Sequence, residues 1–162
     1  MSHSHAPDDG TLSIAESTKI IEDNWTKLKI EPHVDDYSVP LSVERFEHDT
    51  AEARAKGFGV VLGDQHTLLL DLDGDRRPDP RVLDRVEQLF GVKPVMTWAS
   101  KSGNLHMILE TKENLGVETR IALQAILASD PVRELLALAR WHNGVPEPVR
   151  LFKPRTSIPT VL

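Results

Sequence analysis

The stretch Thr67–Gly74 constrains the fold more than any other part of this chain. It reads Thr-Leu-Leu-Leu-Asp-Leu-Asp-Gly, an apolar run that ends with two carboxylates separated by one residue. Side chains alternate between the two faces of a β-strand, so Asp71 and Asp73 are expected to project from the same face. Two carboxylates at the end of a buried strand repel each other unless a cation lies between them. The pattern therefore predicts a site for a hard divalent ion with oxygen ligands, Mg²⁺ or Mn²⁺.

A turn is the alternative interpretation of the same residues. Asp73-Gly74-Asp75 has the composition of a turn, which explains Asp73 without any ligand. It does not explain Asp71, which stands between two leucines, where an unpaired carboxylate is costly. We therefore assign a metal-binding or catalytic role to the pair Asp71 and Asp73.

A second polar segment, residues 100–104, separates two β-rich runs and is followed by His106. It reads Ser-Lys-Ser-Gly-Asn. In such a turn, backbone N–H groups and the Ser102 hydroxyl can hold phosphate oxygens, and Gly103 allows close approach. Lys101 adds a cation, and His106 can donate a hydrogen bond to a phosphate. The same composition also suits an ordinary hairpin turn. We expect His106 to lie on a strand next to the strand that carries the two aspartates.

Hydrophobic periodicity and capping signals predict the order of elements from residue 58 onward. The expected strands are 58–62 and 67–72, joined as a hairpin, then 94–99, 105–110 and 149–152. The expected helices are 80–90, 117–128 and 131–143. This order predicts an α+β fold, a mixed or antiparallel sheet with helices packed on one face.

The N-terminal third differs in charge from the rest of the chain. Residues 1–50 hold eleven acidic and four basic side chains, within a net charge of −6. Residues 1–10 are expected to be a disordered tail and residues 11–57 an acidic helical segment packed on the core. Residues 58–162 are expected to form that core, in a single domain overall. The acidity argues against a protein that coats DNA without regard to sequence.

Two helices are expected in this acidic segment. Ser13 and Glu16 have the spacing of a capping box, which starts a helix that is expected to run to about Lys29. The second is expected to start at Asp49 and to end at Lys56, before Gly57.

Two absences from the sequence restrict the class of protein. The chain has no cysteine, which excludes disulfides and thiolate zinc sites. No apolar run approaches the roughly 18–20 residues of a membrane span, so no membrane partner is expected. We expect a cytoplasmic protein.

The motifs and their order resemble the archaeo-eukaryotic primase superfamily, which includes the primase-polymerases of phages, plasmids and mobile elements. The similarity covers roughly residues 58–152. It rests on Asp-x-Asp at the end of a strand, then a helix and a strand, then Ser-Gly-x-x-His on a hairpin. It implies an RRM-like catalytic core and a metal-dependent primase-polymerase nucleotidyltransferase of phage or mobile-element DNA replication.

The resemblance also implies roles for individual residues. Asp71 and Asp73 would be catalytic metal ligands for Mg²⁺ or Mn²⁺. Ser102 and His106 would contact the triphosphate of the incoming nucleotide, and Lys101 is a looser nucleotide-binding assignment. The implied partners are a nucleoside triphosphate, a single-stranded DNA or RNA template, and other replication proteins.

The sequence departs from this family at the third acidic residue, which is expected on a late strand. The last expected strand is followed by Lys153 rather than by a carboxylate. Asp130 lies at a suitable distance along the chain, although Ser129-Asp130-Pro131 is also typical of a helix N-cap. Glu110 is another candidate, because it would share a strand face with His106. This departure leaves open a second function, a catalytically inactive accessory protein that binds nucleotide, nucleic acid or a host protein.

A third function is suggested by Leu-Leu-Leu-Asp-Leu-Asp-Gly, which resembles the first motif of haloacid-dehalogenase-like phosphatases. In that family the first aspartate is the nucleophile and the second is the acid/base. Asp75 stands where many members have threonine, and no later acidic pair is evident. The residues that follow Asp71 are also few for the doubly wound core of that family.

Overall fold

The computed structural model describes residues 13–16, 19, 41–100 and 102–162. The chain divides into a unit of residues 1–39 and a unit of residues 40–162. In the first unit the predicted capping box is present. Ser13 N donates to Glu16 Oε2 (2.8 Å), and Glu16 N donates to Ser13 Oγ (3.1 Å). The rest of the helix expected up to Lys29 lies outside the described residues, except Lys19, which is helical.

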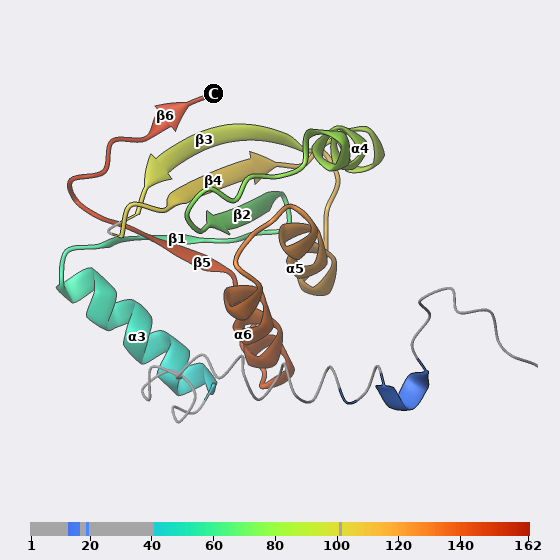
Figure 1. Cartoon of the computed structure of the whole chain (residues 1–162). Coiled ribbons are helices and arrows are strands. Elements are labelled where there is room, and N and C mark those ends of the chain that lie inside the picture. Colours follow the sequence, from blue (N-terminus) through green and yellow to red (C-terminus); the bar gives the residue numbers. More distant parts are fainter. Residues whose placement is uncertain (1–12, 17–18, 20–40, 101) are drawn as a thin grey trace, which may run out of the picture. The chain divides into compact units, whose positions relative to one another are not determined.

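The second unit is an α+β structure of four helices and six strands among its described residues (Figure 1). The helices are α3 (Val43–Ala55), α4 (Pro80–Phe90), α5 (Val117–Ile126) and α6 (Pro131–His142). The strands are β1 (Gly59–Leu62), β2 (Thr67–Leu72), β3 (Lys93–Ala99), β4 (Leu105–Glu110), β5 (Arg150–Lys153) and β6 (Thr160–Val161). Apart from β6, each of these elements overlaps one that the sequence predicts.

The strands form two separate sheets. One has the order β2-β4-β3-β6, and the other pairs β1 with β5. Every strand pair among the described residues is antiparallel. This excludes the doubly wound, mostly parallel sheet that the phosphatase interpretation requires.

The expected hairpin between β1 and β2 is wrong. The backbone of β1 pairs with β5, from Gly59 opposite Lys153 to Leu62 opposite Arg150. The turn after β1 accounts for the difference, because Gly63 N still donates to Val149 O (2.8 Å) and so continues the pairing with β5. The chain then leaves this sheet and enters the other one at β2.

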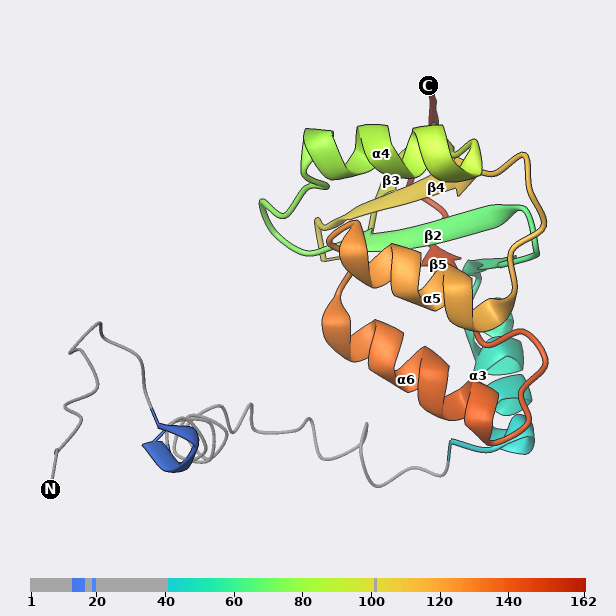
Figure 2. The same ribbon diagram turned by 90° about the vertical axis from the view of Figure 1, so that its right-hand side faces the viewer.

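Helices α4 and α5 pack on one face of β2, whereas α6 packs with residues of the opposite face. Leu68, Leu70 and Leu72 of β2 pack with Val86 of α4 and with Leu123 of α5. Leu69 points to the opposite face, where it packs with Ala137 of α6 among other residues. Figure 2 shows α4 and α5 in front of the strands, on the same side of β2 and β4. Because both faces are covered, β2 reads as an almost continuous apolar run.

Helix α3 begins six residues before the expected start at Asp49. Its N-cap is Ser42, whose Oγ accepts from Arg45 N (3.1 Å). Asp49 instead lies in the helix interior, where it forms an i,i+4 ion pair with Arg45 (3.0 Å). The helix ends as expected, with Gly57 in the left-handed region at φ +90°. Asp49 and Thr50 therefore have the composition of a helix cap but lie within the helix.

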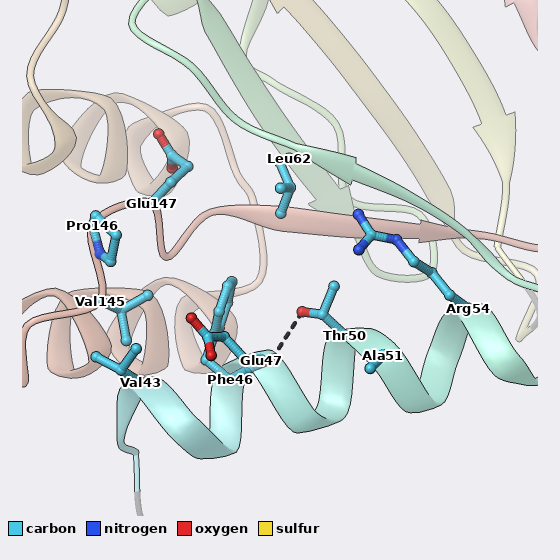
Figure 3. A pocket seen from close by; sticks show the side chains of 10 residues that line it. All are labelled: Val43, Phe46, Glu47, Thr50, Ala51, Arg54, Leu62, Val145, Pro146 and Glu147. Carbon is cyan, nitrogen blue, oxygen red and sulfur yellow. Dashed lines mark hydrogen bonds between the residues drawn. The ribbon is translucent and has the colours of Figure 1, made fainter.

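A shallow, largely apolar groove of about 310 Å³ runs along α3. Figure 3 shows the side chains that line it, and Thr50 Oγ1 donates to Phe46 O (2.8 Å) beneath it. Neither the aspartates nor the histidine predicted as site residues line this groove. Among the described residues, no helix combines the length and the apolar character that crossing a bilayer requires.

Candidate functional site

Asp71 and His106 face each other across the pairing of β2 with β4. The antiparallel register sets Asp71 opposite His106, and His106 Nε2 lies 3.3 Å from Asp71 Oδ1. The backbone N–H and C=O of Asp71 both point away from β4, toward Ser129 and Asp130. The two residues are therefore a non-hydrogen-bonded pair, the kind in which side chains approach most closely.

His106 is buried between Asp71 and Trp98. Only 7 % of His106 is exposed, and its ring packs edge-on against Trp98 with the centroids 5.5 Å apart. Asp71 Oδ1, His106 Nδ1 and Trp98 Nε1 are buried without a hydrogen-bond partner. Such groups cost about 1–3 kcal/mol each when nothing satisfies them. The row of three side chains is thus suited to a bound ligand or ordered water.

Three aspartates meet at the end of β2. One carboxylate oxygen from each of Asp71, Asp73 and Asp130 lies within 4.8 Å of the others. Asp130 also caps α6, where its Oδ1 accepts from Val132 N (3.0 Å). Its position as a helix cap is therefore compatible with a place in the acidic cluster. Glu110, the other candidate, lies at the far end of β4 opposite Thr67 and is not in the cluster.

Backbone contacts join Asp130 to Asp71. Asp130 N donates to Asp71 O (2.8 Å), and Asp71 N donates to Ser129 Oγ (3.0 Å). These bonds use the outer edge of β2, which no strand covers in the part of the chain that the structure describes. The α5–α6 connection therefore acts in place of a neighbouring strand and fixes the distance between the two aspartates.

The aspartates differ in their electrostatic surroundings. Partial burial, together with Asp130 and Asp71, raises the pKa of Asp73 above its usual value. Burial also acts to raise the pKa of Asp71, but the adjacent His106 and the more distant Arg133 outweigh it, so that this pKa is lowered. The three carboxylates therefore concentrate negative charge at the end of β2.

A buried polar network supports this edge of the sheet. Gln124 Oε1 accepts from Leu69 N (3.0 Å), and Gln124 Nε2 donates to Glu134 Oε2 (2.7 Å). Glu134 Oε1 accepts from Ser129 Oγ (2.9 Å) and from Arg133 Nη1 (2.6 Å). Only 3 % of Glu134 is exposed. Burial raises its pKa, although Arg133, Gln124 and Ser129 act in the opposite direction.

The sequence analysis missed this network. Its one signal is periodicity, since Gln124 lies three residues after Ile121 and Glu134 lies three residues before Ala137, on the inward faces of their helices. A polar residue at an inward position requires a buried partner, and that partner could not be named from the sequence.

Asn104 links the polar turn to the acidic cluster. Its Nδ2 donates to Asp73 Oδ1 (2.9 Å) and to Ser102 Oγ (3.3 Å), and its Oδ1 accepts from Gly74 N (3.0 Å). The turn itself closes through Ser100 N, which donates to Asn104 O (2.7 Å). The sequence analysis treated Asn104 only as a turn residue, whereas its side chain positions a carboxylate.

Two cavities meet at Asp71 and His106. One, of about 200 Å³, lies beside the polar turn and includes Ser102 and Asn104. The other, of about 270 Å³, lies between α6 and β5. Phe152 lines both. Ser102 thus lines a cavity together with Asp71 and His106, while Lys101 lies outside the described residues.

The acidic cluster fits a hard divalent ion. Its ligand atoms are all carboxylate oxygens, the donors that Mg²⁺ and Mn²⁺ prefer. Asp71 Oδ1 is buried and has no hydrogen-bond donor, and a cation would relieve the repulsion that raises the pKa of Asp73. Asp71, Asp73 and Asp130 are the residues that would hold the ion.

No protein-family model matches the chain, and searches of curated proteins and of solved structures found no match either.

Proposed function

We propose that this chain is a metal-dependent nucleotidyltransferase of the primase-polymerase type, built on an RRM-like core and acting on a nucleoside triphosphate with a DNA or RNA template. The observation that carries the proposal is the meeting of Asp71, Asp73 and Asp130 within 4.8 Å, beside His106 on the neighbouring strand. The third carboxylate, which the sequence could not assign, is supplied by Asp130.

Each side chain has a distinct task in this proposal. The three carboxylates hold the divalent cation, and Asn104 holds Asp73 in position. When bound, Mg²⁺ or Mn²⁺ would activate a 3′-hydroxyl and neutralise charge on the phosphates. His106 and Ser102 line the cavity next to Asp71, where their N–H and O–H groups can donate to phosphate oxygens.

The test is nucleotide incorporation by the full chain. A primed single-stranded template is incubated with nucleoside triphosphates and Mg²⁺ or Mn²⁺, and extension is read on a denaturing gel. We expect extension that requires the metal and is lost in Asp71→Ala and in Asp73→Asn. Asp75→Asn is the matched control, because Asp75 is exposed in the same loop and lies outside the cluster. Thermal unfolding of each variant separates loss of chemistry from loss of fold.

The accessory-protein alternative makes a different prediction in this assay. A protein that only binds would take up Mn²⁺ and nucleotide without extending any primer, with either metal. Extension that persists in Asp71→Ala would contradict both the proposed site and the proposed reaction.

A further inference from the structure

The cavity between α6 and β5 is bordered by arginines. Arg133 and Arg140 project from α6 and Arg150 from β5, and the cavity reaches Asp71 and His106. Asp71 is the only carboxylate that lines it among the described residues, and His106 already lies against that carboxylate. Three guanidinium groups thus surround one small space that opens onto the candidate site.

Arg133 is paired with a carboxylate of the protein, that of Glu134. Its Nη1 lies 2.6 Å from Glu134 Oε1 and donates to Leu69 O (2.8 Å), while Nη2 donates to Arg150 O (2.9 Å). It therefore joins α6 to both β2 and β5, and its main contribution is to the wall of the cavity.

Arg150 is held rigidly but is not neutralised. Its Nη1 donates to Phe46 O (2.9 Å), and its guanidinium lies 4.0 Å above the Phe46 ring and 5.1 Å from the Phe152 ring. Its Nε and Nη2 groups have no hydrogen-bond acceptor among the residues that the structure describes. A fixed guanidinium with unused N–H groups is well suited to phosphate oxygens.

The surroundings of Arg150 disfavour its positive charge. Burial, together with repulsion from Arg140 and Arg133, lowers the pKa of Arg150 to about 10, against a weaker opposing effect from Asp49. A depressed arginine pKa indicates that the surroundings disfavour the cation. An anion bound between Arg140 and Arg150 would remove that penalty.

We propose that this cavity binds the phosphate groups of the nucleotide, with Arg140 and Arg150 as the residues that contact them; the inference rests on the proposed function of the adjacent site. It differs from the expectation drawn from the sequence, in which Ser102 and His106 provide the phosphate contacts. His106 lines both cavities and can serve either.

The size and place of the cavity favour phosphates over a whole nucleotide. Small-molecule sites span about 300–1,000 Å³, and this cavity has a volume of about 270 Å³. Because it reaches Asp71, phosphates held by the arginines would extend directly toward the acidic cluster. The base and sugar would then lie outside it, toward the adjoining cavity that Phe58 and Phe152 line.

Binding of inorganic tripolyphosphate to the full chain tests the inference. Isothermal titration calorimetry in EDTA removes any contribution from a metal and requires no turnover. We expect Arg140→Gln and Arg150→Gln each to weaken binding about tenfold or more, and Arg150→Lys to restore part of the loss. Arg81→Gln is the matched control, since Arg81 is 91 % exposed on α4.

The outcomes distinguish this inference from the proposed function. Loss of tripolyphosphate binding in both arginine variants, without any primer extension by the unaltered chain, would support the anion site and contradict the enzyme. Normal extension with unchanged tripolyphosphate binding in folded Arg140→Gln would contradict the anion site and leave the enzyme intact. Absence of tripolyphosphate binding to the unaltered chain would also overturn the inference. Arg140 is half-buried and lies away from the contacts with β2. If Arg150→Gln fails to fold, tripolyphosphate binding by Arg140→Gln alone tests the inference.

Discussion

The three aspartates of the cluster are held in two different ways. Asp71 and Asp130 are fixed by a buried network through Ser129 and Glu134. Asp73 is held from the exposed side by a single amide, that of Asn104. Substitutions in the buried half are expected to destabilise the fold, because they would leave polar groups in the core without hydrogen-bond partners. The exposed half can be changed while the fold remains, so it offers the cleaner means of probing ligand binding.

The largest expected effect is on the buried half. In Glu134→Ala, Arg133 would lose its ion-pair partner and Gln124 an acceptor in the core. Breaking a buried pair in this way costs about 3–5 kcal/mol of folding free energy. Urea unfolding followed by circular dichroism measures the loss. The matched control is Glu87→Ala, because Glu87 is exposed on α4.

The pH dependence of that effect follows from the raised pKa of Glu134. A carboxyl whose pKa is higher in the folded state stabilises the protein most below its unfolded pKa, and this contribution is lost as pH rises through the folded value. Unfolding of the unaltered chain and of Glu134→Ala is measured at several pH values from 4 upward. The difference between their free energies of unfolding should become smaller as the pH rises. A gap that widens with pH would contradict the assigned direction.

A smaller effect is expected on the exposed half. Asn104→Ala removes the donor to Asp73 and should weaken Mn²⁺ binding about tenfold or more, as loss of a group that orients a ligand commonly does. Its folding free energy should change by only about 0.5–1.5 kcal/mol, the value of one hydrogen bond. Mn²⁺ binding is measured by electron paramagnetic resonance. Asn143→Ala is the control, because its amide donates to Leu41 O, away from the cluster.

A variant that keeps the size of the side chain but replaces the amide donor by a carboxylate sharpens this experiment. Asn104→Asp would place another carboxylate next to Asp73 and raise its pKa further. Equal Mn²⁺ affinity in Asn104→Ala and the unaltered chain would show that Asn104 serves only the turn.

The last expected effect is the pH dependence of Mn²⁺ binding. Because the pKa of Asp73 is raised, protons compete with the metal for this carboxylate. Mn²⁺ affinity should fall about tenfold per pH unit once the pH drops below that pKa, since one proton is displaced for each ion bound. In Asp73→Asn this dependence should become shallower, whereas Asp75→Asn should retain it. An affinity that does not fall as the pH is lowered would contradict a role for Asp73 as a ligand.

The sequence predicted those elements that are encoded locally. Asp79 caps α4 through Arg81 N (2.9 Å), and Gly91 ends it in the left-handed region, as the Asp-Pro start and the glycine stop indicate. The limits of β2 and β4 also follow from composition and match the prediction. The pairing of Asp71 with His106 could be expected because only one helix and one strand separate them.

Features that depend on distant partners could not be predicted. The sequence of β1 is compatible with pairing to any neighbouring strand. Its pairing with β5 rather than β2 depends on the packing of the whole domain. β6 has only two residues, too few to give a β-rich run in the sequence. The arginine cavity requires α6 and β5 to meet, and the sequence could not show that Arg150 would lie beside the arginines of α6.

The pairing of β1 with β5 has a consequence for how the domain folds. Gly59 and Lys153 can meet only after a long loop has closed, which carries an entropic cost and slows folding. The contact between Asp71 and His106 closes a much shorter loop. The pairing of Asp71 with His106 would therefore form earlier in folding than the pairing of β1 with β5.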